Sequence, residues 1–517
     1  MPGEAMPLTS APARPQARAT TGIAGLDNVL GGGLPRGHLY LVEGSPGAGK
    51  TTLGLQFLLD GRGRGESGVY ITLSETRTEL ALVADSHGWS LDGMEIFELV
   101  SEEGLSPDAE QSILYPSEVE LGETTRAVMD TVRRQKPDRV VFDSLSEMRL
   151  LAQDPLRYRR QILALKHFFA TQGCTVLMLD DLSGSQGQGD LQLHSIAHGV
   201  LALDQSMADY GPVRRHLRIV KMRGVRYRGG EHDLALDTGG LSVFPRLIAA
   251  EHRSDFESSF VSTGTPALDA LLGGGLSRGS NTLFIGPSGV GKTTTAASAV
   301  TAALGRGERV VYYIFDEGLG TLLHRCRALN LPLERYVASG QLQLLPLDPG
   351  EMSPGQFSNM VRHAVERDSA GMVVIDSLNA YMQAMPGAKF LLLQMHELLS
   401  YLNQKGVVTI LVMGQHGLIG EGRNDLDLSY LSDAIVLFRF FEAHGQLLKA
   451  VSVVKSRTSR HELTIREFRL TEEHGVEVGA ALTDFRGVLS GVPSYDGDVE
   501  LMGEADQRRR LRGGAKA

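Results

Sequence analysis

The sequence is poor in cysteine: its 517 residues include only two, Cys174 and Cys326. Two cysteines exclude a disulfide framework and a zinc site built on cysteine ligands, and they favour the reducing cytoplasm as the location. No stretch approaches the roughly 18 consecutive apolar residues of a membrane-spanning helix. The first 21 residues also lack the apolar run of a signal peptide. We therefore expect a cytoplasmic protein that is neither secreted nor embedded in a membrane.

An excess of positive charge is also missing. Lysine and arginine number 51 against 61 aspartate and glutamate residues, which gives a net charge of -10. Strong bulk attraction to nucleic acid or to an anionic membrane is therefore not expected. Hydrophobic residues make up 42% of the chain, which is enough to build cores, and at roughly 150 residues per domain the length predicts two to four domains.

The chain contains an internal duplication. Thr21–Thr52 returns as Thr263–Thr294, with eighteen of thirty-two positions identical. Further along, VYITLSE, an expected strand that ends at Glu75, matches VYYIFDE, an expected strand that ends at Glu317. RVVFDSLS likewise matches MVVIDSLN, and IVKMRG matches VVKSRT. We predict two homologous domains, at residues 19–247 and 261–492, joined by a linker at 248–260. Residues 1–18 and 493–517 lack apolar periodicity, and we expect tails there, the N-terminal one disordered.

Within each domain, short β-branched apolar runs alternate with helical patterns. Runs that are apolar throughout are typical of strands buried on both faces of a parallel sheet. The sequence therefore predicts an α/β protein with two tandem domains, each a mostly parallel central sheet flanked by helices. Antiparallel hairpins should extend the sheets at 199–204 with 217–221 and at 434–441 with 449–455.

Two phosphate-binding loops fit the pattern G-x-x-x-x-G-K-[ST], and each follows a strand and opens a helix. Each α/β domain is therefore predicted to be a P-loop NTPase domain. Their glycines let backbone N–H groups wrap phosphates, and the lysines Lys50 and Lys292 should reach the β- and γ-phosphates of ATP. The predicted ATP-binding residues are Gly44, Ser45, Pro46, Gly47, Ala48, Gly49, Lys50, Thr51 and Thr52 in the first loop, and Gly286, Pro287, Ser288, Gly289, Val290, Gly291, Lys292, Thr293 and Thr294 in the second.

Acidic side chains that could bind Mg²⁺ or act as a base are expected at the ends of strands. Thr51 and Thr293 should bind Mg²⁺ directly, with Asp143 and Asp376 as the second carboxylate on the metal side. Hydrolysis also needs a group that accepts a proton from water or positions it, and the candidates are Glu75, Asp316 and Glu317. An acid after a strand is also a common helix cap, and Thr76 or Thr78 could fill that role instead.

At this point the chain resembles the KaiC family of RecA-like ATPases. The resemblance covers residues 20 to about 492 and is carried by the doubled GLD…GGG…GKT pattern, TLSETRTEL, VVFDSLS, KMRG, SYLSDAIVLFRF and LTDFRGVLSGVP. It implies a homo-oligomeric ring, usually a hexamer of two stacked tiers with ATP at subunit boundaries. In such a ring the basic pairs Lys221/Arg223 and Lys455/Arg457 would reach the γ-phosphate held by the neighbouring subunit.

The resemblance also implies autokinase and autophosphatase activity in the second domain and a slow signalling or clock-like switch. The phosphorylation candidates are Ser429, Tyr430 and Ser432, with tyrosine where the family's acceptor pair has threonine. In the first domain Ala197-His198 replaces Ser-Asp, which fits hydrolysis without autokinase activity. The C-terminal tail lies where the clock protein binds its activating partner, so signalling partners are expected there.

Two other function classes stay open. RecA-like rings include DNA-dependent motors, but the loops Ser183–Asp190 and Gly414–Asp427 are acidic to neutral and lack interleaved basic and aromatic residues, so nucleic acid is not the expected partner. The other class is a nucleotide-gated scaffold, in which ATP holds the ring together and hydrolysis is incidental.

Overall fold

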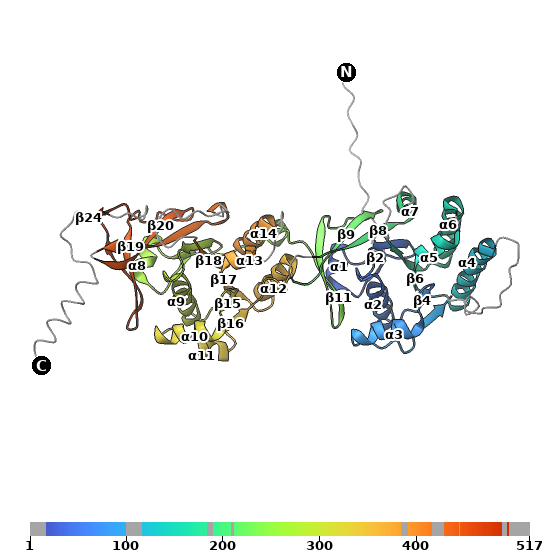
Figure 1. Ribbon diagram of the computed structural model, residues 1–517, viewed down its shortest axis with the longest axis horizontal. Coiled ribbons are helices and arrows are strands. Elements are labelled where there is room, and N and C mark those ends of the chain that lie inside the picture. The colour runs from blue at the N-terminus through green and yellow to red at the C-terminus, as the bar shows by residue number, and fades with distance from the viewer. Residues whose placement is uncertain are drawn as a thin grey trace, which may run out of the picture. The chain divides into compact units, whose positions relative to one another are not determined.

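The computed structural model describes residues 17–99, 116–152, 154–182, 190–207, 211–383, 391–415, 429–443, 445–488 and 494–495. These residues form two compact units that divide between Arg246 and Leu247. Each unit is an α/β domain with a nine-stranded sheet (Figure 1). The α/β class predicted from the apolar runs is therefore confirmed. Among the described residues no helix is long and apolar enough to cross a membrane.

The sheet of the first unit has the order β11-β10-β9-β8-β3-β7-β6-β4-β5. The strands from β8 to β5 pair in parallel, whereas β9, β10 and β11 continue the sheet antiparallel. Their bounds are β3 Leu39–Gly44, β4 Gly68–Thr72, β5 Glu95–Glu98, β6 Arg139–Asp143, β7 Thr175–Asp181, β8 Gly199–Ser206, β9 Arg214–Met222, β10 Glu231–Asp237 and β11 Gly240–Phe244. The hairpin predicted for 199–204 with 217–221 is the pair β8–β9.

Helices cover both faces of this sheet because its central strands are apolar on both sides. Tyr40 and Val42 of β3 belong to one core cluster, while Leu39 and Leu41 belong to the other. The first cluster includes α1 (Ala24–Val29), α2 (Lys50–Gly63) and α3 (Arg77–Ser86), and the second includes α4 (Pro116–Gln135), α5 (Leu145–Ala152), α6 (Pro155–Gln172) and α7 (Asp190–Ile196). Figure 1 shows α2 and α3 on the side away from α6.

Local sequence explains where these helices begin and end. The Thr76 side chain accepts from the backbone N–H of Glu79, and the Glu79 carboxylate accepts from that of Thr76, so α3 starts with a capping box. Asp154 caps α6, Pro155 opens it, and Gly173 ends it with a positive φ of 76°. Since Thr76 is the cap of α3, Glu75 has no capping role.

The second unit repeats the arrangement with the order β16-β15-β17-β18-β14-β19-β20-β21-β22. The strands are β14 Asn281–Gly286, β15 Arg309–Ile314, β16 Leu342–Pro346, β17 Ala370–Asp376, β18 Val408–Gly414, β19 Ala434–Ala443, β20 Gln446–Ser456, β21 Arg466–Thr471 and β22 Gly475–Ala481. The helices are α8 Pro266–Leu271, α9 Lys292–Gly305, α10 Leu319–Ala328, α11 Leu333–Ala338, α12 Pro354–Glu366, α13 Leu378–Gln383 and α14 Leu391–Gln404. β19 and β20 form the second predicted hairpin.

Short two-stranded sheets complete the fold. They pair β1 (Arg18–Ala19) with β2 (Leu34–Pro35), β12 (Phe260–Val261) with β13 (Leu276–Ser277), and β23 (Phe485–Arg486) with β24 (Ser494–Tyr495). The 3₁₀ helices η2 and η3 span Ala249–His252 and Ser429–Leu431.

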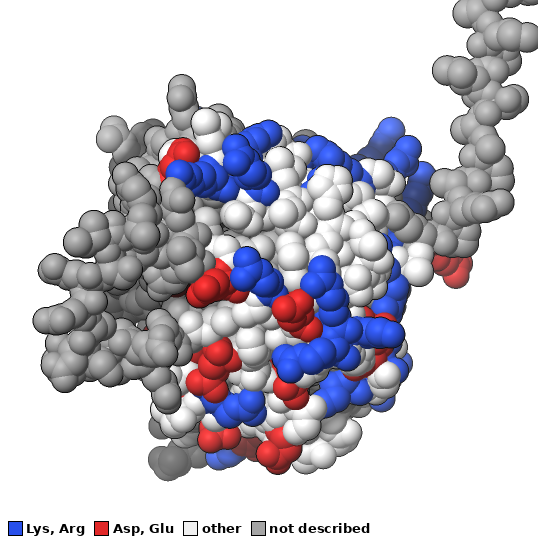
Figure 2. Space-filling view, turned by 90° about the vertical axis from the view of Figure 1, so that its right-hand side faces the viewer, with Lys and Arg blue, Asp and Glu red and all other residues white. Residues whose placement is uncertain are grey.

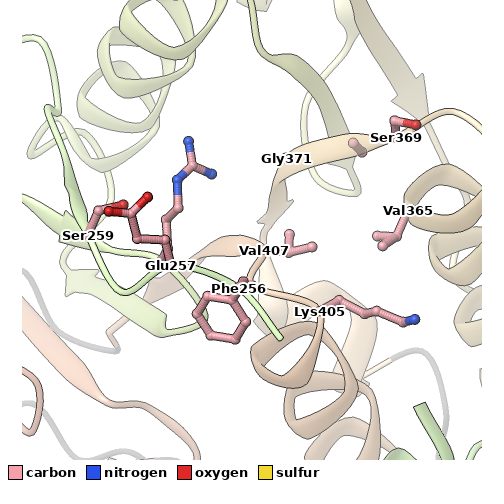
Figure 3. Close-up of a pocket in the computed structure, with 11 residues that line it drawn as sticks. Phe256, Glu257, Ser259, Val365, Ser369, Gly371, Lys405 and Val407 are labelled. Atoms are coloured by element: carbon pink, nitrogen blue, oxygen red, sulfur yellow. The ribbon is translucent and has the colours of Figure 1, made fainter. Parts of the chain in front are cut away.

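The segment after Arg246 packs on the second unit. Leu247 and Ala249 are buried in its core, and the Ala249 N–H donates to Glu397 Oε2 at 3.0 Å. Phe256 lies against Gly279 and Gly406, where a Cβ atom on either glycine would overlap its ring. Beside it is a cavity of about 460 Å³, with Phe256 and Lys405 on one side and Gly371 and Ser369 across from them (Figure 3).

Candidate functional site

The first phosphate loop joins the carboxyl end of β3 to the start of α2. Glycine is required because a Cβ atom on Gly44 would come within 2.3 Å of the Leu203 carbonyl oxygen, and Gly47 and Gly49 have φ values of 78° and 104°. The buried Lys50 Nζ donates to the carbonyl oxygens of Gly44 and Ser45, at 2.8 and 2.9 Å. These contacts hold the lysine inside the turn of the loop.

The second loop repeats this geometry between β14 and α9. A Cβ atom on Gly286 would lie 2.3 Å from the Phe438 carbonyl oxygen. Lys292 Nζ donates to the carbonyl oxygens of Gly286 and Pro287, at 2.8 and 2.7 Å. Burial lowers the pKa of Lys292 to about 8, so its ammonium group is poorly compensated where a phosphate would bind.

Next to each loop, the aspartate that ends the neighbouring strand meets the loop threonine. Thr51 Oγ1 donates to Asp143 Oδ2 at 3.2 Å, and Thr293 makes the corresponding hydrogen bond to Asp376. Both carboxyls are buried, and burial raises their pKa. The hydroxyl and carboxylate oxygens predicted to serve Mg²⁺ are thus together in both domains.

A tyrosine joins each threonine–aspartate pair, and the sequence did not lead us to expect it. Tyr70 Oη donates to Asp143 Oδ2 at 2.6 Å, and Tyr312 Oη donates to Asp376 Oδ2 at 2.8 Å. Both tyrosines are fully buried. Their signal in the sequence is the shared VY in VYITLSE and VYYIFDE.

The candidate bases lie beyond the ends of their strands. The runs VYITLSE and VYYIFDE were expected to be strands up to Glu75 and Glu317, but β4 ends at Thr72 and β15 at Ile314. Thr72 Oγ1 accepts from the Glu75 N–H at 2.9 Å and donates to the Glu75 carbonyl oxygen at 2.7 Å, which turns the chain out of the sheet. In the first domain a polar side chain therefore ends the strand before the end predicted from the apolar pattern.

The surroundings of these carboxylates differ between the two domains. Glu75 Oε2 is buried without a hydrogen-bond partner among the described residues. Burial and then the charges of Asp143, Glu79 and Asp181 raise the pKa of Glu75 to about 7. In contrast, Glu317 forms a two-pronged ion pair with Arg325, both contacts being 2.7 Å, and Asp316 accepts a hydrogen bond from Ser377.

Asp181 is a further site residue that sequence reasoning did not identify. Its Oδ1 lies 2.6 Å from Lys50 Nζ. At the same sheet position the second domain has Gly414, opposite Gly286. The first loop therefore carries an internal ion pair that a nucleotide phosphate must replace, and the second loop does not.

The basic pairs lie near the amino-terminal ends of the central parallel strands, whereas the phosphate loops lie at the carboxyl ends of those strands. Met222 at the end of β9 pairs with Gly199, and Gly199 lies beside Tyr40 at the start of β3. Four residues of strand, about 13 Å, separate Tyr40 from Gly44. In the second domain β20 ends beside Ala434, which lies opposite Thr282 at the start of β14.

In both domains the lysine of the pair is held and the arginine is exposed. Lys221 Nζ donates to the Ala197 carbonyl oxygen at 2.9 Å, and Lys455 Nζ donates to that of Ser432 at 2.7 Å. The side chains of Arg223 and Arg457 are exposed to solvent. Neither arginine is placed to serve the phosphate loop of its own domain.

The phosphorylation candidates differ in exposure. Tyr430 is 49% exposed, whereas Ser432 is 1% exposed and its hydroxyl has no partner among the described residues. Ser429 begins η3, and its side chain lies outside the described residues. Most of the two loops considered for DNA contact also lies outside the described residues, as do residues 1–16 and 496–517 of the tails.

The loops fit ATP and Mg²⁺. Positive-φ glycines leave room for phosphate oxygens, each loop holds a buried lysine, and Ser45 Oγ is buried without a partner among the described residues. Within the described ranges no group of three or more His, Cys, Asp or Glu side chains could hold a metal alone. A Mg²⁺ ion here would depend on phosphate oxygens for its remaining ligands, as is usual for this ion.

Comparisons with known proteins agree with this geometry. A family model described as "ATPase: KaiC" matches twice, at residues 19–248 and 261–483. The chain therefore belongs to the KaiC family of ATPases. It is 26% identical over 487 residues to the circadian clock protein KaiC3 of Synechocystis sp., covering 93% of this chain and 95% of that protein. It is also 26% identical to circadian clock oscillator proteins KaiC of Parasynechococcus marenigrum, with 92% of both chains covered, and of Prochlorococcus marinus, with 93% and 96% covered.

Membership of the KaiC family explains why both halves carry the same constellation. Each RecA-like domain has a loop lysine, a threonine–aspartate–tyrosine group and a distant strand-end basic pair. The two halves differ in the surroundings of Glu75 and Glu317 and in the residue at the positions of Asp181 and His198.

Proposed function

We propose that this KaiC-family ATPase hydrolyses ATP at two sites, each completed by the basic pair of a neighbouring copy in a ring, and that its second domain also phosphorylates itself. The observation that carries the proposal is the position of Arg223 and Arg457. Both are exposed, and both lie at the end of the central strands that is opposite their own phosphate loop. A group so placed serves a nucleotide only when that nucleotide is held by another subunit.

The roles of the site residues follow from their contacts. Lys50 and Lys292 exchange their carbonyl partners for the β- and γ-phosphate oxygens, and in the first domain Lys50 also leaves Asp181. Thr51 with Asp143, and Thr293 with Asp376, hold Mg²⁺, which neutralises charge on the phosphates. Tyr70 and Tyr312 keep the two aspartates oriented.

Chemistry in the first domain uses Glu75 as the general base. A water oxygen attacks the γ-phosphorus, the bond to the β-phosphate oxygen breaks, and Glu75 accepts the proton that the water releases. Its pKa of about 7 suits this task, because the group is about half ionised at neutral pH and basic enough to take a proton. Arg223 of a neighbouring copy stabilises the negative charge that develops on the phosphoryl group.

In the second domain, Glu317 is the corresponding candidate base and is held by Arg325. Asp316 lies beside it, bonded to Ser377, and supplies the second carboxylate. Phosphoryl transfer to the chain itself would use the segment 429–432. Ser432 is buried whereas Tyr430 is exposed, so the expected acceptor is Tyr430 or the neighbouring Ser429.

The test of the ring-completed site uses complementation between inactive subunits. With the first domain disabled by Lys50→Ala, either Arg457→Ala or Lys292→Ala should abolish most phosphate release from γ-labelled ATP. Mixed and reassembled, the two variants should regain activity, because an intact arginine then meets an intact loop. Arg460→Ala, three residues further along, is the matched control and should keep the parent rate. No recovery on mixing, although mass spectrometry finds mixed rings, would contradict the proposal.

The same reactions reveal the autokinase. Phosphopeptide mass spectrometry of the labelled protein should find phosphate on Ser429 or Tyr430, and Ser429→Ala should remove label from the serine. Release of free phosphate with no label on the protein would leave an ATPase without autokinase activity.

A DNA-driven motor has less support. On the face of the first unit that Figure 2 shows, Lys and Arg lie next to Asp and Glu, and among the described residues they form no continuous basic band. Several arginines of the first unit form ion pairs within it, such as Arg133 with Asp130 and Arg77 with Glu98. We therefore expect no stimulation of hydrolysis by DNA.

A further inference from the structure

The two domains differ at one position beside the strand-end arginine. The Arg223 N–H donates to the His198 carbonyl oxygen at 3.0 Å, and the Arg457 N–H donates to the Asp433 carbonyl oxygen at 2.9 Å. The N–H groups of His198 and Asp433 in turn donate to Leu39 and Asn281, the first residues of β3 and β14. His198 and Asp433 thus occupy the same place in the fold.

In the second domain, Asp433 provides local negative charge. Its Oδ2 accepts from the Asn281 N–H at 3.0 Å and from Asn403 Nδ2 at 3.1 Å, and its Oδ1 lies 3.7 Å from Arg457 Nη1. The arginine therefore has a counter-charge within its own subunit.

In the first domain, this place holds a cluster of basic groups. The His198 ring stacks on His38, with centroids 3.9 Å apart and planes inclined by 7°. Lys166 and Arg223 lie beside the stack, and the four residues line a small cavity of about 50 Å³. The other lining residues, Gly37, Leu39, Phe169 and Ala170, carry no charge. We call His38, Lys166, His198 and Arg223 the basic cluster.

Burial and neighbouring positive charges lower the pKa of three members of the basic cluster. Burial, then the charges of His38, Arg223 and Lys166, lower the pKa of His198 to about 4. Burial and Lys166 lower the pKa of His38, and burial and Arg223 lower the pKa of Lys166. His198 Nε2 is buried and has no hydrogen-bond partner among the described residues. An anion in the cavity would relieve this mutual repulsion.

We propose that the basic cluster of the first domain binds a small inorganic oxyanion of the phosphate class. Lys166, Arg223 and a protonated His198 would donate to its oxygens, as charged donors do to phosphate. The cavity exceeds the roughly 10–15 Å³ that one water molecule needs, and it is far too small for a nucleotide. Because Arg223 is shared, a bound anion would hold that arginine back from a neighbouring nucleotide; only this consequence rests on the proposed function.

The test measures inorganic phosphate binding to the full chain, with both loops first filled by a non-hydrolysable ATP analogue and Mg²⁺. Calorimetry should find one phosphate per chain, and the imidazole NMR signal of His198 should titrate at higher pH when phosphate is present. His198→Asp installs the carboxylate found in the second domain and should weaken binding by about tenfold or more. His38→Ser, which copies Ser280, should weaken it less.

Lys405→Met is the matched control, since this lysine lines the larger cavity in the second unit. It should leave phosphate affinity unchanged. Equal affinity in wild type and His198→Asp, equal weakening by Lys405→Met, or no binding at millimolar phosphate would each overturn the site. Because these readouts do not involve hydrolysis, they stand apart from the test of the proposed function. Nucleotide binding by the His198→Asp protein confirms that it has folded.

Discussion

At the residue scale, the clearest contrast is between the two candidate bases. Glu317 has both carboxylate oxygens on Arg325, whereas Glu75 faces other carboxylates and has a buried oxygen without a described partner. A free carboxylate is better able to accept a proton than one held by a guanidinium group. The first domain is therefore expected to be the more sensitive of the two to pH.

This contrast gives a prediction for Glu75. In a Lys292→Ala background, phosphate release by the first domain should rise as pH increases, because Glu75 must lose its proton to act as a base. The raised pKa places the midpoint at about 7, and bound Mg²⁺ beside Asp143 would move it lower. Glu75→Gln should reduce the rate by about 100-fold or more and remove the inflection. A pH profile that is the same in Glu75→Gln would contradict the assignment.

At the scale of elements, the start of β6 is tied to α2 by one buried arginine. Arg139 is 1% exposed, and its guanidinium contacts Glu66 at 2.6 Å, Asp60 at 3.2 Å and the Phe57 carbonyl oxygen at 2.6 Å. At the same sheet position the second domain has Met372. At this position the first domain thus has a buried ion-pair network, and the second domain has an apolar side chain in its core.

Replacing Arg139 by the methionine of the second domain should therefore destabilise the first domain. The substitution leaves Asp60 and Glu66 without a buried partner, a loss of about 3 kcal/mol in the free energy of unfolding. Denaturation followed by the fluorescence of Trp89, the single tryptophan of the chain, reports on this unit alone. Arg64→Ala removes an exposed partner of the same Asp60 and should change stability by less than about 1 kcal/mol. Equal losses in both variants would show that burial is not the cause.

Elements also show how far sequence reasoning reaches. The loops, the aspartates Asp143 and Asp376 and both hairpins were predictable because repeated local motifs specify them. Asp181 and the tyrosine partners were not, since their contacts depend on which strands become neighbours. The end of β4 was placed too late because Thr72 bonds the backbone of Glu75, a contact that the apolar pattern does not reveal. The end of β15 was also placed too late, at Glu317 rather than at Ile314.

At the scale of the whole molecule, the duplication has produced two sites that can be observed separately. Trp89 belongs to the first unit and packs against Gly240, where a Cβ atom would overlap its ring. Its neighbour His87, with ring centroids 4.9 Å apart, lies 3.4 Å from Thr52 Oγ1 through Nε2. One chain of contacts therefore joins the first phosphate loop to the only tryptophan.

Nucleotide binding to the first loop should thus change the fluorescence of Trp89, because ordering of Thr52 moves His87 against the indole. Titration with ATP analogue and Mg²⁺ should give this change in wild type and in Lys292→Ala, but not in Lys50→Ala. His87→Phe, which keeps the ring but removes the hydrogen bond to Thr52, should bind nucleotide with a smaller change. The opposite result, a fluorescence change lost in Lys292→Ala and kept in Lys50→Ala, would contradict this prediction. Trp89 would then report on nucleotide at the second loop, and the two sites would be coupled.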